Sequence, residues 1–264
     1  MIGLATATSG IAASILPRGR TTHSRFEIPL QTSESTMINM SKQSGVPKLI
    51  RKVKVIILDE APMAKRQTIE TVDRSFRDIM DIDKPFGGKV MVFGGDFRQV
   101  LPVVQKSTRA EIINASLVKS YLLTLMEKIQ FTRNMRARTD PTFREFLLRV
   151  GYGDEQTIKE KLILLPKQLT IKHSKDKIPE ESIIKEIFQN LQENVATTKY
   201  VTERAILASR NDHVDKINNK LISQFPGESK ILNSFDSAED DTNNYYQEEY
   251  LNTLTPNGLP PHRY

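Results

Sequence analysis

The stretch Lys54-Val55-Ile56-Ile57-Leu58, followed directly by Asp59-Glu60, decides the fold. A short apolar run rich in β-branched residues predicts a buried strand, usually of a parallel sheet. A helical stretch follows it and is broken at Gly87-Gly88, and Lys89–Phe93 then repeats the strand pattern. This order predicts a doubly wound α/β sheet, which binds ligands at the carboxyl ends of its strands. The inward face of the helix is predicted to hold Ile69, Val72, Phe76, Ile79 and Met80.

Further elements are predicted on both sides of this unit. Residues 6–15 predict a strand end and a turn that leads into a helix of small residues around Gly10–Ser14. Residues 31–48 predict an irregular insertion, and Tyr121–Ile129 predicts a third strand. Asp140-Pro141 is typical of a helix start, and the inward face of that helix is predicted to hold Phe143, Phe146, Leu147 and Val150.

The chain changes character after residue 150. Residues 151–203 are mostly polar and predict helices interrupted at Pro166 and Pro179. Arg204–Ala208 predicts another buried strand, which would begin a second α/β lobe. Residues 226–264 predict a loop. Asn211 or Asp212 is expected to cap a helix with Val214, Ile217, Leu221 and Phe225 inward.

Composition and charge limit the classes of function. The 264 residues contain no cysteine, which excludes disulfides, a thiolate zinc site and a cysteine nucleophile. No apolar run approaches the roughly 20 residues of a bilayer span, and no signal-peptide pattern is present, so an intracellular protein without a membrane partner is expected. The net charge is +6, and residues 236–250 hold acids without Lys or Arg. A basic body suits a polyanion such as nucleic acid, although a solvated lysine-rich surface would look the same.

Asp59 and Glu60, at the end of a predicted strand, are the first candidates for chemistry. One carboxylate can hold Mg²⁺ and its neighbour can accept a proton from an attacking water, as hydrolysis of a nucleoside triphosphate requires. The alternative is an acidic strand end that faces solvent. Gln99, in the segment after Gly94-Gly95, can hydrogen-bond a terminal phosphate or a water, and Arg136 can bind phosphate bidentately.

The segment from Thr6 to Ala13 offers hydroxyls and backbone amides at a helix start, where anions bind favourably. Thr22-His23-Ser24 follows shortly. A capped helix and a histidine with satisfied hydrogen bonds would account for these residues equally well. For Gln99 and Arg136, the corresponding alternatives are a glycine turn and an ordinary surface arginine.

In order and spacing, the segments resemble the motifs of superfamily 1 helicases, and they are most similar to the PIF (petite integration frequency) family of ATP-dependent DNA helicases, in its Helitron-like branch. The resemblance covers almost the whole chain. It is carried by Thr-Ser-Gly-Ile-Ala-Ala (8–13), Gly-Arg-Thr-Thr-His-Ser-Arg-Phe (19–26), Leu-Asp-Glu-Ala-Pro-Met (58–63), Pro-Phe-Gly-Gly-Lys-Val (85–90), Phe-Gly-Gly-Asp-Phe-Arg-Gln-Val-Leu-Pro-Val (93–103), Asn-Met-Arg (134–136), Glu-Arg-Ala-Ile-Leu-Ala (203–208) and Gly-Leu-Pro-Pro-His (258–262).

The resemblance implies two RecA-like lobes, here residues 1–137 and residues 138–264, both incomplete. It also implies ATP between the lobes, single-stranded DNA across them, and unwinding of duplex or forked DNA in the 5′ to 3′ direction. The implied processes are telomere maintenance, DNA recombination and DNA repair in the nucleus. Asp59 would serve Mg²⁺, Glu60 would activate water, and Gln99 and Arg136 would reach the terminal phosphate. Residues matching DNA-contact segments are Thr8, Ser9, Gly10, His23 and Asn211.

One departure from the family pattern sets a further expectation. The phosphate-binding loop Gly-x-x-x-x-Gly-Lys-[Ser/Thr] does not occur in the sequence, and Gly87-Gly88-Lys89 has the wrong spacing to replace it. The chain is therefore expected to be the middle of a helicase, cut at both ends, and a poor or inactive ATPase. Two alternatives stand beside this: a non-catalytic single-strand-binding remnant of a transposon helicase, and an incomplete gene model of an ordinary helicase.

Overall fold

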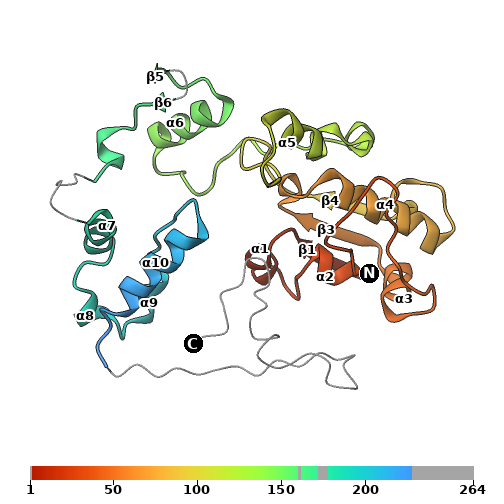
Figure 1. Ribbon diagram of the computed structural model, residues 1–264, viewed down its shortest axis with the longest axis horizontal. Coiled ribbons are helices and arrows are strands. Elements are labelled where there is room, and N and C mark those ends of the chain that lie inside the picture. The colour runs from red at the N-terminus through yellow and green to blue at the C-terminus, as the bar shows by residue number, and fades with distance from the viewer. Residues whose placement is uncertain (1, 160–161, 172–177, 228–264) are drawn as a thin grey trace. The chain divides into compact units, whose positions relative to one another are not determined.

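The computed structural model describes residues 2–159, 162–171 and 178–227, and the chain divides into two compact units at residues 154 and 155 (Figure 1). The predicted terminal loop lies almost wholly outside these residues, and the Gly-Leu-Pro-Pro-His segment does so entirely. The lobe boundary after residue 137 stays a prediction. The first unit contains β1 (Gly3–Ala7), α1 (Gly10–Ser14), β2 (Arg20–Thr21), α2 (Thr22–Phe26), α3 (Gly45–Lys52), β3 (Val55–Asp59), η1 (Ala61–Met63), α4 (Arg66–Met80), η2 (Pro85–Gly88), β4 (Val90–Phe93), α5 (Arg109–Ala115), η3 (Leu117–Lys119), η4 (Tyr121–Leu125) and α6 (Pro141–Tyr152).

The first unit is built on a sheet of four strands in the order β2-β1-β3-β4, and all three neighbouring pairs are parallel. Ala7 lies opposite Asp59 on one side and Thr21 on the other, so the carboxyl ends of these strands meet at one edge. The predicted parallel α/β sheet is thus confirmed for this unit. The strand predicted from Lys54 to Leu58 is β3.

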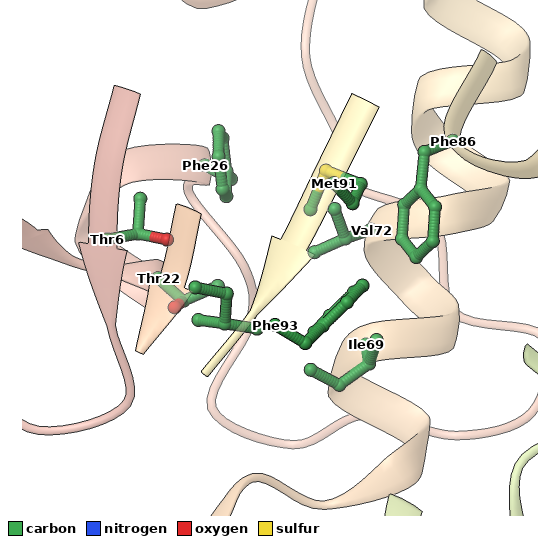
Figure 2. A pocket seen from close by; sticks show the side chains of 9 residues that line it. Thr6, Thr22, Phe26, Ile69, Val72, Phe86, Met91 and Phe93 are labelled. Atoms are coloured by element: carbon green, nitrogen blue, oxygen red, sulfur yellow. The ribbon is translucent and has the colours of Figure 1, made fainter. Parts of the chain in front are cut away.

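One face of this sheet packs on α4. Alternate residues of a strand point to opposite faces, so Ile56 and Leu58 are buried on that side while Ile57 is 41% exposed on the other. Figure 2 shows Ile69 and Val72 of α4 turned toward β4 in this core. The predicted inward face of α4 is confirmed: Ile69, Val72, Phe76 and Ile79 are buried, and Met80 packs against the same cluster.

Strand β4 differs from the prediction of a buried strand. It is an edge strand among the described residues, with β3 as its neighbour. Val90 is 57% exposed and Val92 is 47% exposed, because both lie on the face opposite α4. An apolar run such as residues 89–93 does not distinguish a strand that is covered by other elements on both faces from a strand that is covered on one face.

Two buried acids of α4 fasten the helix to its surroundings. Asp73, which is fully buried, accepts hydrogen bonds from the Phe86 N–H at 2.6 Å, the Tyr121 hydroxyl at 2.7 Å and the Arg77 Nε at 3.0 Å. Glu70 accepts from the Ser120 hydroxyl at 2.8 Å. Charged groups this deep are stable only when paired, so the network fixes the turns before β4 and after α5 against α4.

Two other predictions for this unit are corrected. Tyr121–Ile129 is not a strand, because it begins with the 3₁₀ turn η4, in which Leu122 is buried and the Tyr121 hydroxyl is directed to Asp73. The irregular insertion ends earlier than residue 48, because α3 begins at Gly45. The predicted start of α6 is confirmed: the Asp140 carboxylate accepts the Phe143 N–H at 2.9 Å, and Pro141 occupies the first turn. Of its predicted inward face, Phe146 is buried.

The described part of the second unit consists of a small hairpin and helices. The predicted strand Arg204–Ala208 is irregular there, and Leu207 is 92% exposed. The predicted cap is also wrong, because Arg210 is the N-cap residue of the last helix and Asp212 pairs with Arg210 at 2.8 Å. The described residues of this unit contain the antiparallel pair β5-β6 and no parallel sheet, and the predicted second α/β lobe stays a prediction. The elements are β5 (Thr157–Lys159), β6 (Leu162–Ile163), η5 (Lys167–Leu169), α7 (Pro179–Ile187), α8 (Leu191–Asn194), α9 (Thr198–Thr202) and α10 (Asn211–Ile222).

Candidate functional site

Most of the predicted site residues lie at the carboxyl ends of the sheet strands. We call this edge the carboxyl rim and define it by Thr8–Gly10 after β1, Thr22-His23 after β2, Asp59-Glu60 at the end of β3 and Gly94-Gly95 after β4. The sheet is parallel, so these four segments are neighbours at one edge although they are distant in sequence.

Backbone and hydroxyl hydrogen bonds join these segments. The Thr8 N–H donates to the Asp59 carbonyl at 3.2 Å, and the Thr8 hydroxyl donates to the Glu60 carbonyl at 3.1 Å. The Thr22 hydroxyl donates to the Ala7 carbonyl at 3.0 Å, which fastens the start of α2 to the end of β1. The carboxyl rim is therefore one connected structure.

The acid pair is held in a specific backbone conformation. The Asp59 carboxylate accepts the Glu60 N–H at 3.0 Å, and Glu60 has φ of 53°, in the left-handed region. Such a conformation costs a residue with a side chain about 1–3 kcal/mol and persists only where neighbours enforce it. Here the Thr8 hydroxyl and the Ala61 N–H, which donates to the Gly94 carbonyl at 2.9 Å, hold the turn on both sides.

Gly94 and Gly95 make room for the acid segment. A Cβ on Gly94 would lie 2.9 Å from Asp59 Oδ1. A Cβ on Gly95 would lie 2.2 Å from the Pro62 Cδ, and Gly95 has φ of 149°. The segment that these glycines approach closely is Asp59–Pro62.

Ser9 and Gly10 form the start of α1. The Ser9 hydroxyl accepts the Ala12 N–H at 3.1 Å, so the alternative of a capped helix is confirmed for this residue. The cap uses the serine oxygen as an acceptor, and the hydroxyl hydrogen remains a donor by chemistry. Gly10 follows as the first residue of the helix.

His23 lies on α2, directly after Thr22. Its side chain is half-buried, and desolvation by this burial lowers the pKa of His23 below the ordinary value of 6.5. The imidazole is therefore neutral at pH 7, where one ring nitrogen donates and the other accepts.

Gln99 lies in the loop after β4. Its N–H donates to the Asp96 carbonyl at 3.0 Å, and the side chain is exposed. Sequence reasoning missed Arg98, which forms two short contacts of 2.9 Å with the Asp96 carboxylate and lies 5.0 Å from the centre of the Tyr152 ring on α6. The pKa of Asp96 is lowered by the Arg98 hydrogen bond. This pair holds the loop that carries Gln99.

Arg136 and Asn211 do not join the carboxyl rim through described contacts. Arg136 is exposed, and its N–H donates to Asn134 Oδ1 at 3.0 Å. In residues 2–159, no hydrogen bond or ion pair connects Arg136 or Gln99 to Asp59 or Glu60. Asn211 begins α10 in the second unit. The convergence of Asp59, Glu60, Gln99 and Arg136 around one triphosphate stays a prediction.

Asp59 and Glu60 offer carboxylate oxygens, which are the ligands that Mg²⁺ prefers. No group of three or more His, Cys, Asp and Glu side chains is arranged to hold a metal in the described ranges. Mg²⁺ needs only one or two protein carboxylates, since substrate phosphates and waters complete its six ligands. Asp59 offers one such carboxylate at a strand end, and any side chain at position 94 would crowd it.

The parallel sheet, the acid pair at the end of β3 and the glycine segment after β4 define a RecA-like α/β protein. A family profile described as "PIF1-like helicase" matches residues 1–161. The chain belongs to the PIF1-like helicase family.

Individual relatives agree with this family. The chain is 26% identical over 239 residues to "ATP-dependent DNA helicase PIF1" of Xenopus laevis, covering 88% of this chain and 32% of that protein. It is 33% identical over 100 residues to "ATP-dependent DNA helicase Pif1" of Psychrobacter, covering 37% of this chain and 15% of that protein. The chain thus spans about a third or less of the length of these relatives.

Solved structures show the same fold. The chain is similar to the crystal structure of Pif1 helicase from Candida albicans, with a TM-score of 0.59 and 19% identity, covering 97% of this chain and 51% of that chain. It is also similar to Pif1 helicase from Bacteroides in complex with ADP-AlF3 and ssDNA, with a TM-score of 0.58 and 20% identity, covering 89% of this chain and 51% of that chain. No helix in the described residues has the length and apolarity to cross a membrane.

Proposed function

We propose that this chain supplies part of the ATP-hydrolysing and DNA-binding machinery of an ATP-dependent DNA helicase. The observation that carries the proposal is the hydrogen bond from the Thr8 hydroxyl to the Glu60 carbonyl. It joins a segment proposed to contact DNA to a segment proposed to activate water. A helicase requires that kind of connection, because nucleotide hydrolysis has to change the affinity of the protein for the DNA strand.

The proposed chemistry is hydrolysis of ATP with Mg²⁺. Asp59 would hold the ion, which would neutralise charge on the phosphates when bound. Glu60 would accept a proton from the attacking water, and Gln99 and Arg136 would hydrogen-bond the terminal phosphate. The left-handed turn at Glu60 supports the proposal, because such strained turns cluster at functional sites.

The proposed DNA surface follows the same edge of the sheet. Thr8, Ser9, Gly10 and His23 lie on the carboxyl rim, where hydroxyls, backbone amides and a neutral imidazole can donate to phosphate oxygens. Asn211 would contribute from the second unit. The titles of the solved structures support DNA as the ligand, since one describes Bacteroides Pif1 in complex with ssDNA and another describes DNA unwinding at forked dsDNA by two Pif1 helicases.

The finer assignments also belong to this proposal. They are unwinding in the 5′ to 3′ direction, action in telomere maintenance, DNA recombination and DNA repair, location in the nucleus, and descent from the Helitron-like branch. Eukaryotic relatives named PIF1 helicases support the nuclear assignment. We further propose that the isolated chain hydrolyses ATP poorly, because its sequence contains no Gly-x-x-x-x-Gly-Lys-[Ser/Thr] loop.

The test measures ssDNA binding and ATP turnover on the purified 264-residue chain. We expect binding of a fluorescent oligonucleotide, with turnover far below the usual enzyme range of about 1–10³ per second. Residual turnover is expected to vanish in Glu60→Gln and to persist in Glu145→Gln, which alters an exposed acid of α6. Turnover that survives Glu60→Gln, or an absence of ssDNA binding, would overturn the proposal.

A second candidate is a non-catalytic single-strand-binding protein. It is favoured by the charge distribution, because six acids lie within residues 236–250 and the rest of the chain carries a net charge of +12. This function predicts binding that weakens steeply with salt and is unaffected by ATP or by Glu60→Gln. A change in ssDNA affinity on adding ATP and Mg²⁺ would exclude it.

A further inference from the structure

Three arginines gather between α1 and the end of α2. Arg18 and Arg20 lie on either side of Gly19, and Arg25 is on α2. Arg25 Nη2 donates to the Arg18 carbonyl at 2.6 Å, so the Arg25 side chain lies back toward the other two residues. We call Arg18, Arg20 and Arg25 the arginine cluster.

The arginine cluster lacks an acidic counterpart. Among the described residues, no carboxylate lies within 4.0 Å of any of these guanidinium groups, whereas Arg66, Arg77 and Arg98 all have acidic partners. The Arg25 Nε is buried and has no hydrogen-bond partner in the described residues. Desolvation and the neighbouring charge of Arg20 lower the pKa of Arg25, which means that both effects destabilise its protonated, positively charged form.

The backbone that carries these arginines is fixed. The Gly19 N–H donates to the Leu16 carbonyl at 2.9 Å, and a Cβ on Gly19 would lie 2.2 Å from the Ala13 carbonyl oxygen. Arg18 has φ of 54°, a left-handed conformation. A tight turn that requires glycine thus presents two arginines at a set position, rather than on a mobile loop.

The arginine cluster also continues the carboxyl rim. Arg20 pairs in register with Thr6 and Thr21 pairs with Ala7, so β2 lies alongside the end of β1. Arg25 is two residues after His23 on α2, so the two side chains leave different faces of the helix, and the Arg25 guanidinium lies back against Arg18. A strand that runs from Thr8 past β2 would meet Arg20, and Arg25 and Arg18 lie beside Arg20.

We propose that Arg18, Arg20 and Arg25 form a phosphodiester-binding site that holds the backbone of a nucleic-acid strand next to Thr8 and His23. The inference rests on the proposed DNA-binding function and adds residues and a ligand group to it. A phosphate supplies the acceptors and the negative charge that this cluster lacks. Arginine suits the role because its planar fork binds phosphate oxygens bidentately.

The experiment compares Arg20→Gln and Arg25→Lys with Lys54→Gln in the full 264-residue chain. Lys54 is exposed at the opposite edge of the sheet, where its N–H donates to the Ile2 carbonyl, and its substitution removes the same charge as Arg20→Gln. Binding of a fluorescent oligothymidylate is measured across a salt series. Each phosphate contact on a single strand contributes about 0.7 to the slope of log K against log [salt].

We expect Arg20→Gln to lower the magnitude of that slope by about 0.7. Lowering the salt from 1 M to 0.1 M would then strengthen binding by the variant about fivefold less than binding by the unsubstituted chain. We expect Lys54→Gln to leave the slope unchanged. Arg25→Lys keeps the charge and is expected to weaken binding through loss of the fork. Equal slopes for Arg20→Gln and Lys54→Gln would overturn the inference alone, because binding itself would persist. No binding by the unsubstituted chain would overturn the proposed function together with it. Binding of pyrophosphate is measured on the same variants. If Arg20→Gln loses pyrophosphate binding but keeps oligonucleotide binding, the arginine cluster is a site for free phosphate groups, and the inference is overturned.

Discussion

The Thr8 hydroxyl and the Glu60 carbonyl are 3.1 Å apart and hydrogen-bonded, although the two residues are 52 positions apart in the chain. Each lies directly after a strand, and the two strands pair in register from Gly3 with Val55 to Ala7 with Asp59. Because the bond crosses between strand ends, a shift of the segment after β1 would disturb the backbone turn at Glu60. Thr8 thereby connects two parts of the carboxyl rim.

Replacing Thr8 with valine tests this connection. Thr8→Val keeps the shape but removes the hydroxyl, and we expect a loss of about 1 kcal/mol in the free energy of unfolding. Amide hydrogen exchange at Glu60 and Ala61 is expected to accelerate, because their turn loses one of its restraints. Thr8→Ser keeps the donor and serves as the control. Equal exchange rates in the two variants would contradict the restraining role of the hydroxyl.

Replacing Gly95 with alanine tests the packing of the glycine segment against the acid segment. The new Cβ would lie 2.2 Å from the Pro62 Cδ at a φ of 149°, so we expect a loss of about 2–3 kcal/mol in the free energy of unfolding. Gly45→Ala is the matched control, because no atom lies within 4 Å of its added Cβ and the residue begins α3. Urea unfolding measures both. A stability loss for Gly95→Ala no larger than that for Gly45→Ala would show that the contact with Pro62 is unimportant.

His23 predicts a pH dependence of stability on the acid side. Burial lowers the pKa of His23 in the folded chain below 6.5, so the unfolded chain binds this proton more readily. The stabilising contribution is complete above pH 6.5 and is lost as the pH falls through the folded pKa. We expect the His23 resonances to titrate with a midpoint below 6.5 in NMR spectra, and His23→Gln to flatten the acid side of the stability profile. A midpoint above this value would contradict the burial of the ring.

Tyr121 predicts a second dependence, on the alkaline side. Burial, the hydrogen bond to Asp73 and the charge of that carboxylate raise the pKa of Tyr121 from 10 to about 12. The unfolded chain therefore releases the proton first, and stability contributed by the protonated phenol is lost as the pH rises from 10 to about 12. Tyr121→Phe removes this group.

The measurement for Tyr121 is the difference between the two unfolding profiles. We expect Tyr121→Phe to lose about 1.5–3 kcal/mol at neutral pH, as is usual for a hydrogen bond to a charged acceptor. That difference is expected to shrink above pH 10. A difference that stays constant across the alkaline range would show that the phenol proton is bound equally in the folded and unfolded chains.

The sequence predicted those elements whose pattern is local. β3 follows from a run of apolar residues, and α4 follows from apolar residues at helical spacing. The segment Tyr121–Ile129 is equally apolar, but its conformation is set by Asp73, which is 48 positions away from Tyr121. The strand prediction for Arg204–Ala208 was wrong for a similar reason. A strand needs a neighbouring strand to pair with, and the composition of one segment does not show whether such a neighbour exists.

The candidate site was predictable to a similar extent. Asp59 and Glu60 were found because they end a recognisable strand. The bond from Thr8 to Glu60 depends on strand order and register, which local patterns do not contain. The arginine cluster had a visible signal, three arginines within residues 18–25, but charge density alone does not show which arginines lack acidic partners.

The exposed face and edge of β4 have a practical consequence for handling the protein. In the described part of the chain, β4 hydrogen-bonds to a strand on one side only, and its outward valines are exposed. Such a ribbon offers a template on which another polypeptide can extend the sheet. Purified material should therefore self-associate as its concentration rises, and a charged substitution at Val92 should keep it monodisperse.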